Sequence, residues 1–398
     1  MLRADEARYG LSEAARQPHH QPNPPAVLRE LAATADVRFN GGRPWDIQVH
    51  DPEVYRRTLR HGSLGFGEAY MEGLWDSPRL DELFNRLLRT DINSKIRGLL
   101  RVRLLAGVLA NLLGNLLVNR QSQRRAFQVG QHHYDIGNSI YQAMLDPSMS
   151  YSCGYWAKAE TLEQAQHDKL DLICRKLELA PGERLLDIGC GWGGLLRHAA
   201  EHYGVEALGI TVSKEQQRLA RERCQGLPVD IELMDYRDLT GRFDKVVSVG
   251  MFEHVGPKNY PAYFQTVLRV MSDDGLFLLH TIGDFSTDNV TDPWIDKYIF
   301  PNYKLPSAKR LATTFEPDFL ILDWHNFGTD YDRTLMAWWD KFDAAWPELQ
   351  GGQYDERFYR MWKYYLHSCA GYFRSRQGQL WQVVLSKRGR LSEYRSLR

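Results

Sequence analysis

The sequence predicts an α/β fold in which a smaller, mostly helical N-terminal domain precedes a parallel sheet with crossover helices. Short apolar runs alternate with helix-length segments from about residue 161 onward, which is typical of such a sheet. A glycine-rich loop follows the first of these runs, and a leucine-rich helical segment comes well before it. With 398 residues, the chain is long enough for two domains that each bury a core.

Composition argues against several classes of protein. The 50 basic residues balance the 50 acidic ones, which disfavours a chain dominated by nucleic-acid contacts. The five cysteines are scattered without a CxxC pair, so we expect neither a disulfide framework nor a thiolate zinc site. Adjacent histidines such as His132 and His133 point apart along a chain, and we expect no metal. Met1–Pro25 lacks the apolar core of a signal peptide and is expected to be flexible.

The N-terminal domain is expected to span residues 1–118, and a polar linker is expected at 119–131. Within the domain, Trp45–Leu88 combines helical stretches with two other features. These are a strand-like run at Ile47–His50 and a glycine-rich turn at Gly62–Gly67.

A basic segment coincides with the leucine-rich helix at Leu99–Val118. The arginines and asparagines of this helix make it a poor transmembrane span and give it an amphipathic pattern. From Ile92 to Tyr134 the chain has lysines and arginines but no acidic residue. Two interpretations remain open: the apolar face packs in the core of a small helical domain, or the segment binds an anionic membrane surface.

The α/β domain is expected to span residues 132–398. A helix at Thr161–Leu179 precedes the sheet and ends at Pro181-Gly182. Parallel strands are predicted at Arg184–Ile188, Val205–Ile210, Ile231–Met234, Lys245–Val249 and Leu276–His280. Two later runs, Phe319–Trp324 and Leu380–Ser386, would close one edge of the sheet. The aromatic segment Asp292–Pro306 and the pair Trp338-Trp339 would line a channel or pack on the core.

The glycine-rich loop lies where a nucleotide-binding sheet keeps its ligand, after the first strand. Gly189, Gly191 and Gly194 match the GxGxxG pattern, which NAD-binding folds share. A dinucleotide site needs a carboxylate about 20 residues further on, but the second strand ends at Thr211 without one. Asp187 instead places a negative charge beside the loop, which would favour an ammonium or sulfonium cofactor. A helix-capping or loop-ordering carboxylate is the alternative for this residue.

Longer sequence motifs connect this glycine-rich pattern with a known protein family. They are LLDIGCGWGG at Leu185–Gly194, ITVSKEQ at Ile210–Gln216, DYRD at Asp235–Asp238 and VGMFEHVGPKNY at Val249–Tyr260. Together with HHYDIGN, MSYSCGYW, LLHTIG, DPWIDKYIFP, DWHNFGTDYDRTLMAW and LWQVV, they resemble the family of cyclopropane-fatty-acyl-phospholipid synthases and mycolic acid cyclopropane synthases. The resemblance covers the chain from about residue 40 onward. It implies a class I S-adenosylmethionine-dependent methyltransferase domain with a Rossmann-like fold.

The resemblance also implies an activity and its site. The family transfers a methylene group from S-adenosylmethionine to the cis double bond of an unsaturated acyl chain in a membrane phospholipid. The residues implied to bind the cofactor are Tyr151, Ser152, Asp187, Gly189, Cys190, Gly191, Trp192, Gly194, Thr211, Gln216, Asp235 and Tyr236. A bicarbonate ion is implied to be the base, held by Glu253, His280, Tyr331 and the backbone at Cys153 and Ile282.

Some assignments stay open beside the resemblance. Direct base catalysis by His280 or Glu253 competes with the bicarbonate interpretation. Cys369 has been regarded as an active-site residue of the family, but a carbocation mechanism needs no thiolate, and we expect a structural role. Rival functions are methyl-branch formation on unsaturated lipids, an NAD-dependent oxidoreductase and a lipid-surface binding module. The family further suggests a homodimer, in the cytoplasm and peripherally bound to the inner face of the membrane.

Overall fold

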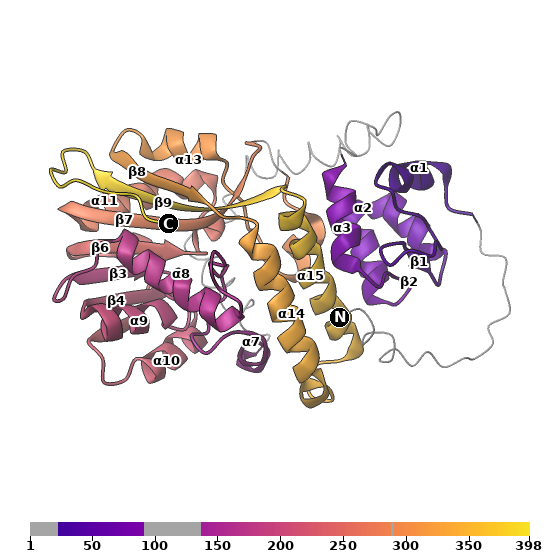
Figure 1. Ribbon diagram of the computed structural model, residues 1–398, viewed down its shortest axis with the longest axis horizontal. Helices are drawn as coiled ribbons and strands as arrows, with labels where there is room; N and C mark the ends of the chain where they lie inside the picture. The colour runs from indigo at the N-terminus through magenta and orange to yellow at the C-terminus, as the bar shows by residue number, and fades with distance from the viewer. Residues whose placement is uncertain (1–22, 91–136, 288–289) are drawn as a thin grey trace.

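The computed structural model describes residues 23–90, 137–287 and 290–398. A seven-stranded sheet with helices on both faces forms the larger part, and a smaller, mostly helical part lies beside it (Figure 1). The predicted basic helix Leu99–Val118, the linker at 119–131 and the pair His132-His133 lie outside the described residues, as does most of Met1–Pro25. In the part of the chain that is described, no helix has the length and apolarity needed to span a bilayer.

The large sheet has the strand order β5-β4-β3-β6-β7-β9-β8. Its strands are β3 (Arg184–Ile188), β4 (Glu206–Thr211), β5 (Val229–Leu233), β6 (Phe243–Val249), β7 (Met271–Asp284), β8 (Phe319–Asn326) and β9 (Gly378–Lys387). Strands β3 to β7 pair in parallel, whereas β9 runs antiparallel between β7 and β8. The strand predictions are therefore confirmed, including the position of the last two at one edge. From β3 the next strands are added toward one edge of the sheet, and from β6 onward they are added toward the other edge. Ligands of open α/β sheets bind at such a switch point, here between β3 and β6.

Helices cover both faces of this sheet. On one face lie α8 (Leu162–Lys176), α9 (Gly194–Tyr203) and α10 (Lys214–Arg223), and on the other α11 (Tyr260–Val270) and α13 (Ala308–Phe315). The pleat of β3 explains how one strand serves both cores, because Leu185 packs with α8 and α9 while Leu186 packs with α11. A capping box between Thr161 and Gln164 starts α8 at the predicted place.

The N-terminal part contains α1 (Ala26–Thr34), β1 (Gln48–Val49), α2 (Glu53–Met71), β2 (Trp75–Asp76) and α3 (Leu80–Arg89). The predicted glycine-rich turn at Gly62–Gly67 is confirmed only at Gly62 (φ 58°, ψ −133°), where two helical segments of α2 meet at a kink, and is wrong for the residues after it, which are helical. Tertiary packing explains the later glycines. A Cβ on Gly67 would lie 2.4 Å from the Trp294 ring, so glycine here lets α12 (Pro293–Tyr298) approach α2.

Two long helices join the parts: α14 (Asp330–Leu349) and α15 (Glu356–Arg374). Another of the described helices, α7 (Asn138–Met144), packs against α14. Helix α15 packs directly on α3, and a Cβ on Gly371 would lie only 2.8 Å from the backbone nitrogen of Asn85. This close approach ties a helix of the larger part to the N-terminal part along its length.

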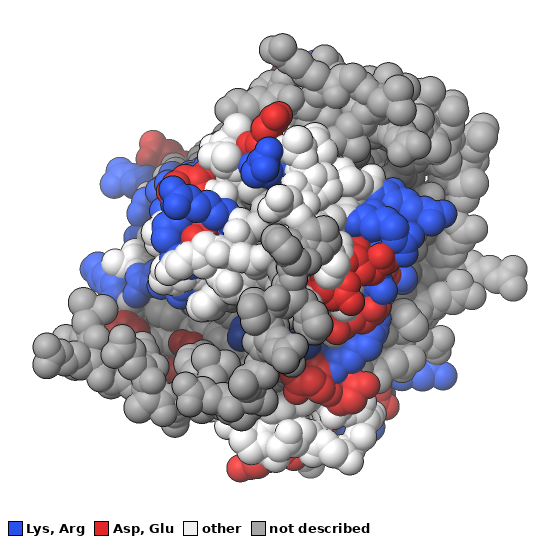
Figure 2. Space-filling view, turned by 90° about the vertical axis from the view of Figure 1, so that its right-hand side faces the viewer, with Lys and Arg blue, Asp and Glu red and all other residues white. Residues whose placement is uncertain are grey.

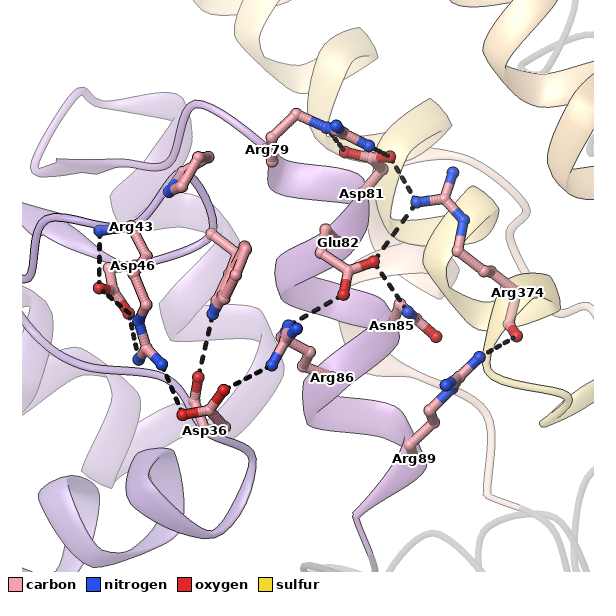
Figure 3. Close-up of polar contacts among 12 residues, drawn as sticks. Asp36, Arg43, Asp46, Arg79, Asp81, Glu82, Asn85, Arg86, Arg89 and Arg374 are labelled. Carbon is pink, nitrogen blue, oxygen red and sulfur yellow. Dashed lines mark hydrogen bonds and ion pairs between the residues drawn. The ribbon is translucent and has the colours of Figure 1, made fainter.

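An ionic cluster closes this helix pair (Figure 3). Arg374 of α15 donates to Asp81 of α3 at 2.6 Å and makes two bonds of 2.8 Å to Asp332 of α14. Burial alone would raise the pKa of Asp81, but hydrogen bonds from Arg79 and Arg374 outweigh it and lower that pKa. The carboxylate therefore stays charged in a buried position because two guanidinium groups surround it.

Candidate active site

A cavity of about 1710 Å³ opens at the carboxyl ends of the parallel strands and extends to the N-terminal part. All twelve residues predicted to bind the cofactor line it: Tyr151, Ser152, Asp187, Gly189, Cys190, Gly191, Trp192, Gly194, Thr211, Gln216, Asp235 and Tyr236. Of the predicted catalytic residues, Glu253, Ile282, Tyr331 and Cys369 also line it, whereas Cys153 and His280 are buried behind its wall.

The glycine-rich loop is shaped by close contacts on one side and open space on the other. A Cβ on Gly194 would lie 2.3 Å from the carbonyl oxygen of Ser148, and one on Gly189 would lie 2.7 Å from Met251. Gly191 has a φ of 54° and no atom within 4 Å of its Cβ position, so its backbone borders the cavity freely. Helix α9 begins at Gly194, directly after the loop. Backbone amides are thus exposed to a ligand at a helix start.

Asp187 lies at the end of β3 with little access to solvent. Its Oδ1 atom has no hydrogen-bond partner, and burial raises its pKa to about 7. The charge of Lys169 on α8 opposes this shift, although its ammonium group donates to the Ser152 hydroxyl. A cationic group brought against Asp187 would favour its ionised form. The site therefore fits the charged methionine portion of S-adenosylmethionine.

Two further strand ends contribute polar groups to the same cavity. After β4, the hydroxyl of Thr211 donates to Oε1 of Gln216 at 2.8 Å, which fixes the orientation of that amide. After β5, Asp235 accepts from Arg237 at 2.8 Å and caps the turn that contains Tyr236. Burial raises the pKa of Tyr236 to about 12, so its hydroxyl remains a donor.

Glu253 follows β6 in a short 3₁₀ turn, Phe252–His254. Its Oε1 accepts the backbone N–H of Ile282 at 2.7 Å, while its buried Oε2 has no partner. Burial raises the pKa of Glu253 to about 7. The side chain is therefore poised to hold or release a proton near neutral pH. The N–H of Ile282, predicted to hold an anion, is already engaged with this carboxyl group.

Cys153 and Tyr331 lie in one apolar cluster with Phe327, Leu380 and Ile282. Tyr331 stacks on Phe373 with ring centroids 4.5 Å apart, and burial holds its pKa well above the ordinary value. Its hydroxyl therefore keeps its proton. The Cys153 thiol donates to the carbonyl of Gly154, and burial also raises its pKa well above normal. The thiol is thus a neutral packing group.

Cys369 of α15 borders the cavity, consistent with the structural role expected for it. Burial raises its pKa to about 12, so the side chain is a neutral thiol and not a thiolate. The aromatic segment Asp292–Pro306 lines the same cavity through Phe300 and Tyr303, whereas Trp338 and Trp339 are buried elsewhere. Apolar side chains of the N-terminal part extend this wall: Leu28, Leu31, Phe39, Phe66, Phe84 and Leu87.

Two polar residues that support the site were not predicted. Lys169 is buried, lines the cavity and donates to the hydroxyl of Ser152 at 2.8 Å. Thr334 of α14 accepts from the backbone N–H of Gly154 and from the indole of Trp156. The signal for Lys169 was present in the sequence, because it falls four residues after an apolar-face position of its helix, where leucine is expected.

Fold and cavity together define a class, the Rossmann-like S-adenosylmethionine-dependent methyltransferases. The family model described as mycolic acid cyclopropane synthetase matches residues 121–383, and the chain belongs to this family. The cyclopropane-fatty-acyl-phospholipid synthase of Escherichia coli strain K12 is 53% identical over 365 residues, which cover 91% of this chain and 93% of that protein. The tuberculostearic acid methyltransferase UfaA1 of Mycobacterium tuberculosis is 33% identical over 86% of this chain and 83% of its own.

Solved structures agree with this assignment. The cyclopropane synthase MmaA2 from Mycobacterium tuberculosis has a TM-score of 0.62 and 30% identity, covering 66% of this chain and 98% of its own. The mycolic acid cyclopropane synthase CmaA1, solved with SAH and CTAB, has a TM-score of 0.61 and 31% identity over the same shares. The rival interpretation as an NAD-dependent oxidoreductase is therefore rejected, and S-adenosylmethionine is the cofactor class that the family and the CmaA1 structure support.

Proposed function

We propose that this chain is a cyclopropane-fatty-acyl-phospholipid synthase, which converts the cis double bonds of acyl chains in membrane phospholipids to cyclopropane rings. One observation carries the phospholipid assignment. The likeness to the Escherichia coli synthase extends over 91% of the chain and so includes the N-terminal part, whereas the mycobacterial structures cover 66%. The N-terminal part contributes apolar wall to the cavity, as a long acyl chain requires.

S-adenosylmethionine supplies an electrophilic methyl group when it is bound in the cavity. The loop from Asp187 to Gly194 would hold it with backbone amides, and the Asp187 carboxylate would pair with its positive charge. Tyr151 and Ser152 line the same cavity, and Thr211, Gln216, Asp235 and Tyr236 would hold the ribose and base. Because an alkene is a weak nucleophile, the residues act chiefly by alignment and by excluding water.

Positive charge develops on the acyl chain after methyl transfer and must be stabilised without being trapped. Glu253 and the aromatic residues Tyr331 and Phe300 line the same cavity. Such groups stabilise a cation electrostatically. Tyr331 stays neutral because of burial, so it stabilises the cation without trapping it as an ether.

The last step removes a proton from the transferred methyl group. Bicarbonate would supply a base at this place, held by Glu253, His280, Tyr331 and the backbone of Cys153 and Ile282, with the Ile282 N–H acting through the Glu253 carboxyl group that it already contacts. Two buried atoms without partners support this fit, Oε2 of Glu253 and Nε2 of His280. Glu253 needs to be protonated beside an anion, and burial already raises its pKa to about 7. Direct proton removal by His280 or Glu253 is the competing proposal.

Residues 1–118 would form a membrane-association domain, 119–131 a linker and 132–398 the catalytic domain of a cytoplasmic homodimer. On the N-terminal face, the charges that the structure describes lie interspersed, and several are paired, as in Arg57–Glu72 and Arg86–Glu82 (Figure 2). Attraction to an anionic membrane therefore rests on the basic sequence from Ile92 to Tyr134. Replacing Arg101, Arg103, Arg120, Arg124 and Arg125 with Gln should weaken sedimentation with anionic vesicles, and unchanged binding would contradict the proposal.

The activity is tested with purified protein, S-adenosylmethionine and vesicles of a monounsaturated phospholipid. Mass spectrometry of the released fatty acids should show a product heavier by one CH₂ that resists mild hydrogenation. A product that takes up hydrogen, or a branched chain, would favour methyl-branch formation instead. No added carbon would contradict the proposal altogether.

A further inference from the structure

A row of polar side chains crosses three neighbouring strands behind the cavity. His280 of β7 lies opposite Gln382 of β9, and Gln382 lies opposite His325 of β8. Residues directly opposite each other in antiparallel strands point to the same face of the sheet. Gln382 is fully buried and His280 is 1% exposed, and the Gln382 oxygen Oε1 has no partner among the residues that the structure describes, so the one polar contact of this amide is the one its nitrogen makes.

One contact in this row favours one tautomer of His280. The amide nitrogen Nε2 of Gln382 lies 3.3 Å from Nδ1 of His280. An amide nitrogen can only donate, so Nδ1 of His280 is the acceptor and carries no proton. Burial lowers the pKa of His280 well below its ordinary value, with Lys169, Lys176 and His325 adding to the effect, so the ring is neutral. Its single proton is therefore on Nε2.

The Nε2–H group of His280 is a donor without an acceptor among the residues that the structure describes. The His280 ring packs against Phe327 at 5.8 Å between centroids, and Phe327 belongs to the cluster that contains Cys153 and Tyr331. A buried donor left unpaired costs about 1–3 kcal/mol, which a native protein tolerates chiefly where a ligand supplies the acceptor.

We propose that Gln382 is a positioning residue that keeps the proton of neutral His280 on Nε2, so that His280 donates a hydrogen bond to the anionic base and cannot itself be the base. This inference rests on the proposed function for the identity of the reaction. It excludes His280 from the three candidate bases, because a nitrogen that already carries the proton cannot accept another from the substrate while the ring stays neutral. Proton removal then falls to the bound anion or to Glu253.

Two substitutions at Gln382 separate this role from simple packing. In Gln382→Glu, a carboxylate replaces the donor, accepts from Nδ1–H and so moves the proton away from Nε2. In Gln382→Met, the volume is kept and neither nitrogen is favoured. We expect kcat to fall about 100-fold or more in Gln382→Glu and only about tenfold or less in Gln382→Met, with the KM for S-adenosylmethionine unchanged in both.

Gln379→Glu on the same strand is the matched control. Gln379 uses its oxygen Oε1 to accept from Trp381 and Asn326, which a glutamate can also do. The control variant should therefore keep a kcat within about twofold of the unsubstituted protein, since its carboxylate lies away from His280. Equal losses of kcat in Gln382→Glu and Gln382→Met would overturn the proposal, because packing alone would then explain them.

A spectroscopic measurement can locate the proton on the His280 ring without an activity assay. Nitrogen-15 NMR of the histidine-labelled full-length protein, with the His280 signals assigned by a His280→Gln variant, distinguishes a protonated Nε2 from a protonated Nδ1. We expect the proton on Nε2 in the unsubstituted protein and on Nδ1 in Gln382→Glu. A proton on Nδ1 in the unsubstituted protein would refute the proposal even if the Gln382 variants fail to fold. Absence of cyclopropane product would instead refute the proposed function and leave this result standing.

Discussion

Removing the guanidinium of Arg374 should weaken the contact between α3 and α15 and lower the free energy of unfolding. This side chain makes one hydrogen bond to the buried carboxylate of Asp81 and two to Asp332. In Arg374→Met, Asp81 retains only Arg79, whose side chain is 57% exposed, and its charge becomes poorly compensated. Breaking a buried pair costs about 3–5 kcal/mol. Because Arg374 is 23% exposed and one partner remains, we expect about 2–3 kcal/mol here.

The assay is a double-mutant cycle in which unfolding is followed by circular dichroism. Arg374→Met should lower Tm by about 5 °C at pH 7, while Arg357→Met, an exposed position of the same helix, should change stability by less than about 0.5 kcal/mol. In the double variant Arg374→Met/Asp81→Asn, the loss should be smaller than the sum of the single losses by about 1 kcal/mol or more. Strictly additive losses would refute the argument that the two side chains act as a pair.

Acid should weaken the same contact, because the pKa of Asp81 is lowered in the folded protein. The stabilisation that the charged Asp81 provides is present above its ordinary pKa of 3.8 and is lost as the pH falls below that value. Acid unfolding of the unsubstituted protein and of Asp81→Asn measures this loss. Glu253→Gln should abolish turnover yet stabilise the protein more at pH 8 than at pH 6, because burial raises the pKa of Glu253 from 4.5 to about 7 and the buried carboxyl group therefore costs stability progressively as pH rises from 4.5 to about 7; an equal Tm gain at both pH values would contradict this. Gly194→Ala should weaken S-adenosylmethionine binding at least tenfold by calorimetry, because its Cβ would lie 2.3 Å from the Ser148 carbonyl, and unaltered affinity would count against the loop as the cofactor site. Cys369→Ala should retain kcat within about fivefold, since a buried neutral thiol has no chemical step to perform, and a loss near that of Glu253→Gln would assign it one.

Local sequence patterns were sufficient to predict the strands of the large sheet. Each strand of the parallel core is a short apolar run between helix-length segments, and β3 was predicted with its observed ends, Arg184 and Ile188. The loop after it was predictable because closely packed glycines leave a motif in the sequence. The same argument held at Gly62, which breaks α2, but failed for Gly65 and Gly67, which lie within the helix that follows and where Gly67 serves a tertiary contact to Trp294. Nothing local distinguishes a glycine of a turn from one that admits a distant indole.

The candidate site was predictable residue by residue but not as a geometry. The motifs named Glu253 and His280, yet they did not indicate that His280 lies behind the cavity wall with Gln382 as its partner. That contact depends on the register between β7 and β9, which are separated by about a hundred residues of sequence. Likewise, the engagement of the Ile282 N–H with Glu253 follows from a side-chain rotamer that no periodicity encodes.

The most direct test of the account uses S-adenosylmethionine with a fully deuterated methyl group and vesicles of a monounsaturated phospholipid. The account predicts a fatty acid that keeps two of the three deuterium atoms, resists mild hydrogenation and is not formed by Glu253→Gln. Loss of one deuterium reports removal of a proton from the transferred methyl group, which is the step assigned to the groups around Glu253. A product that keeps all three deuterium atoms would contradict the account, because the cation would then have met another fate.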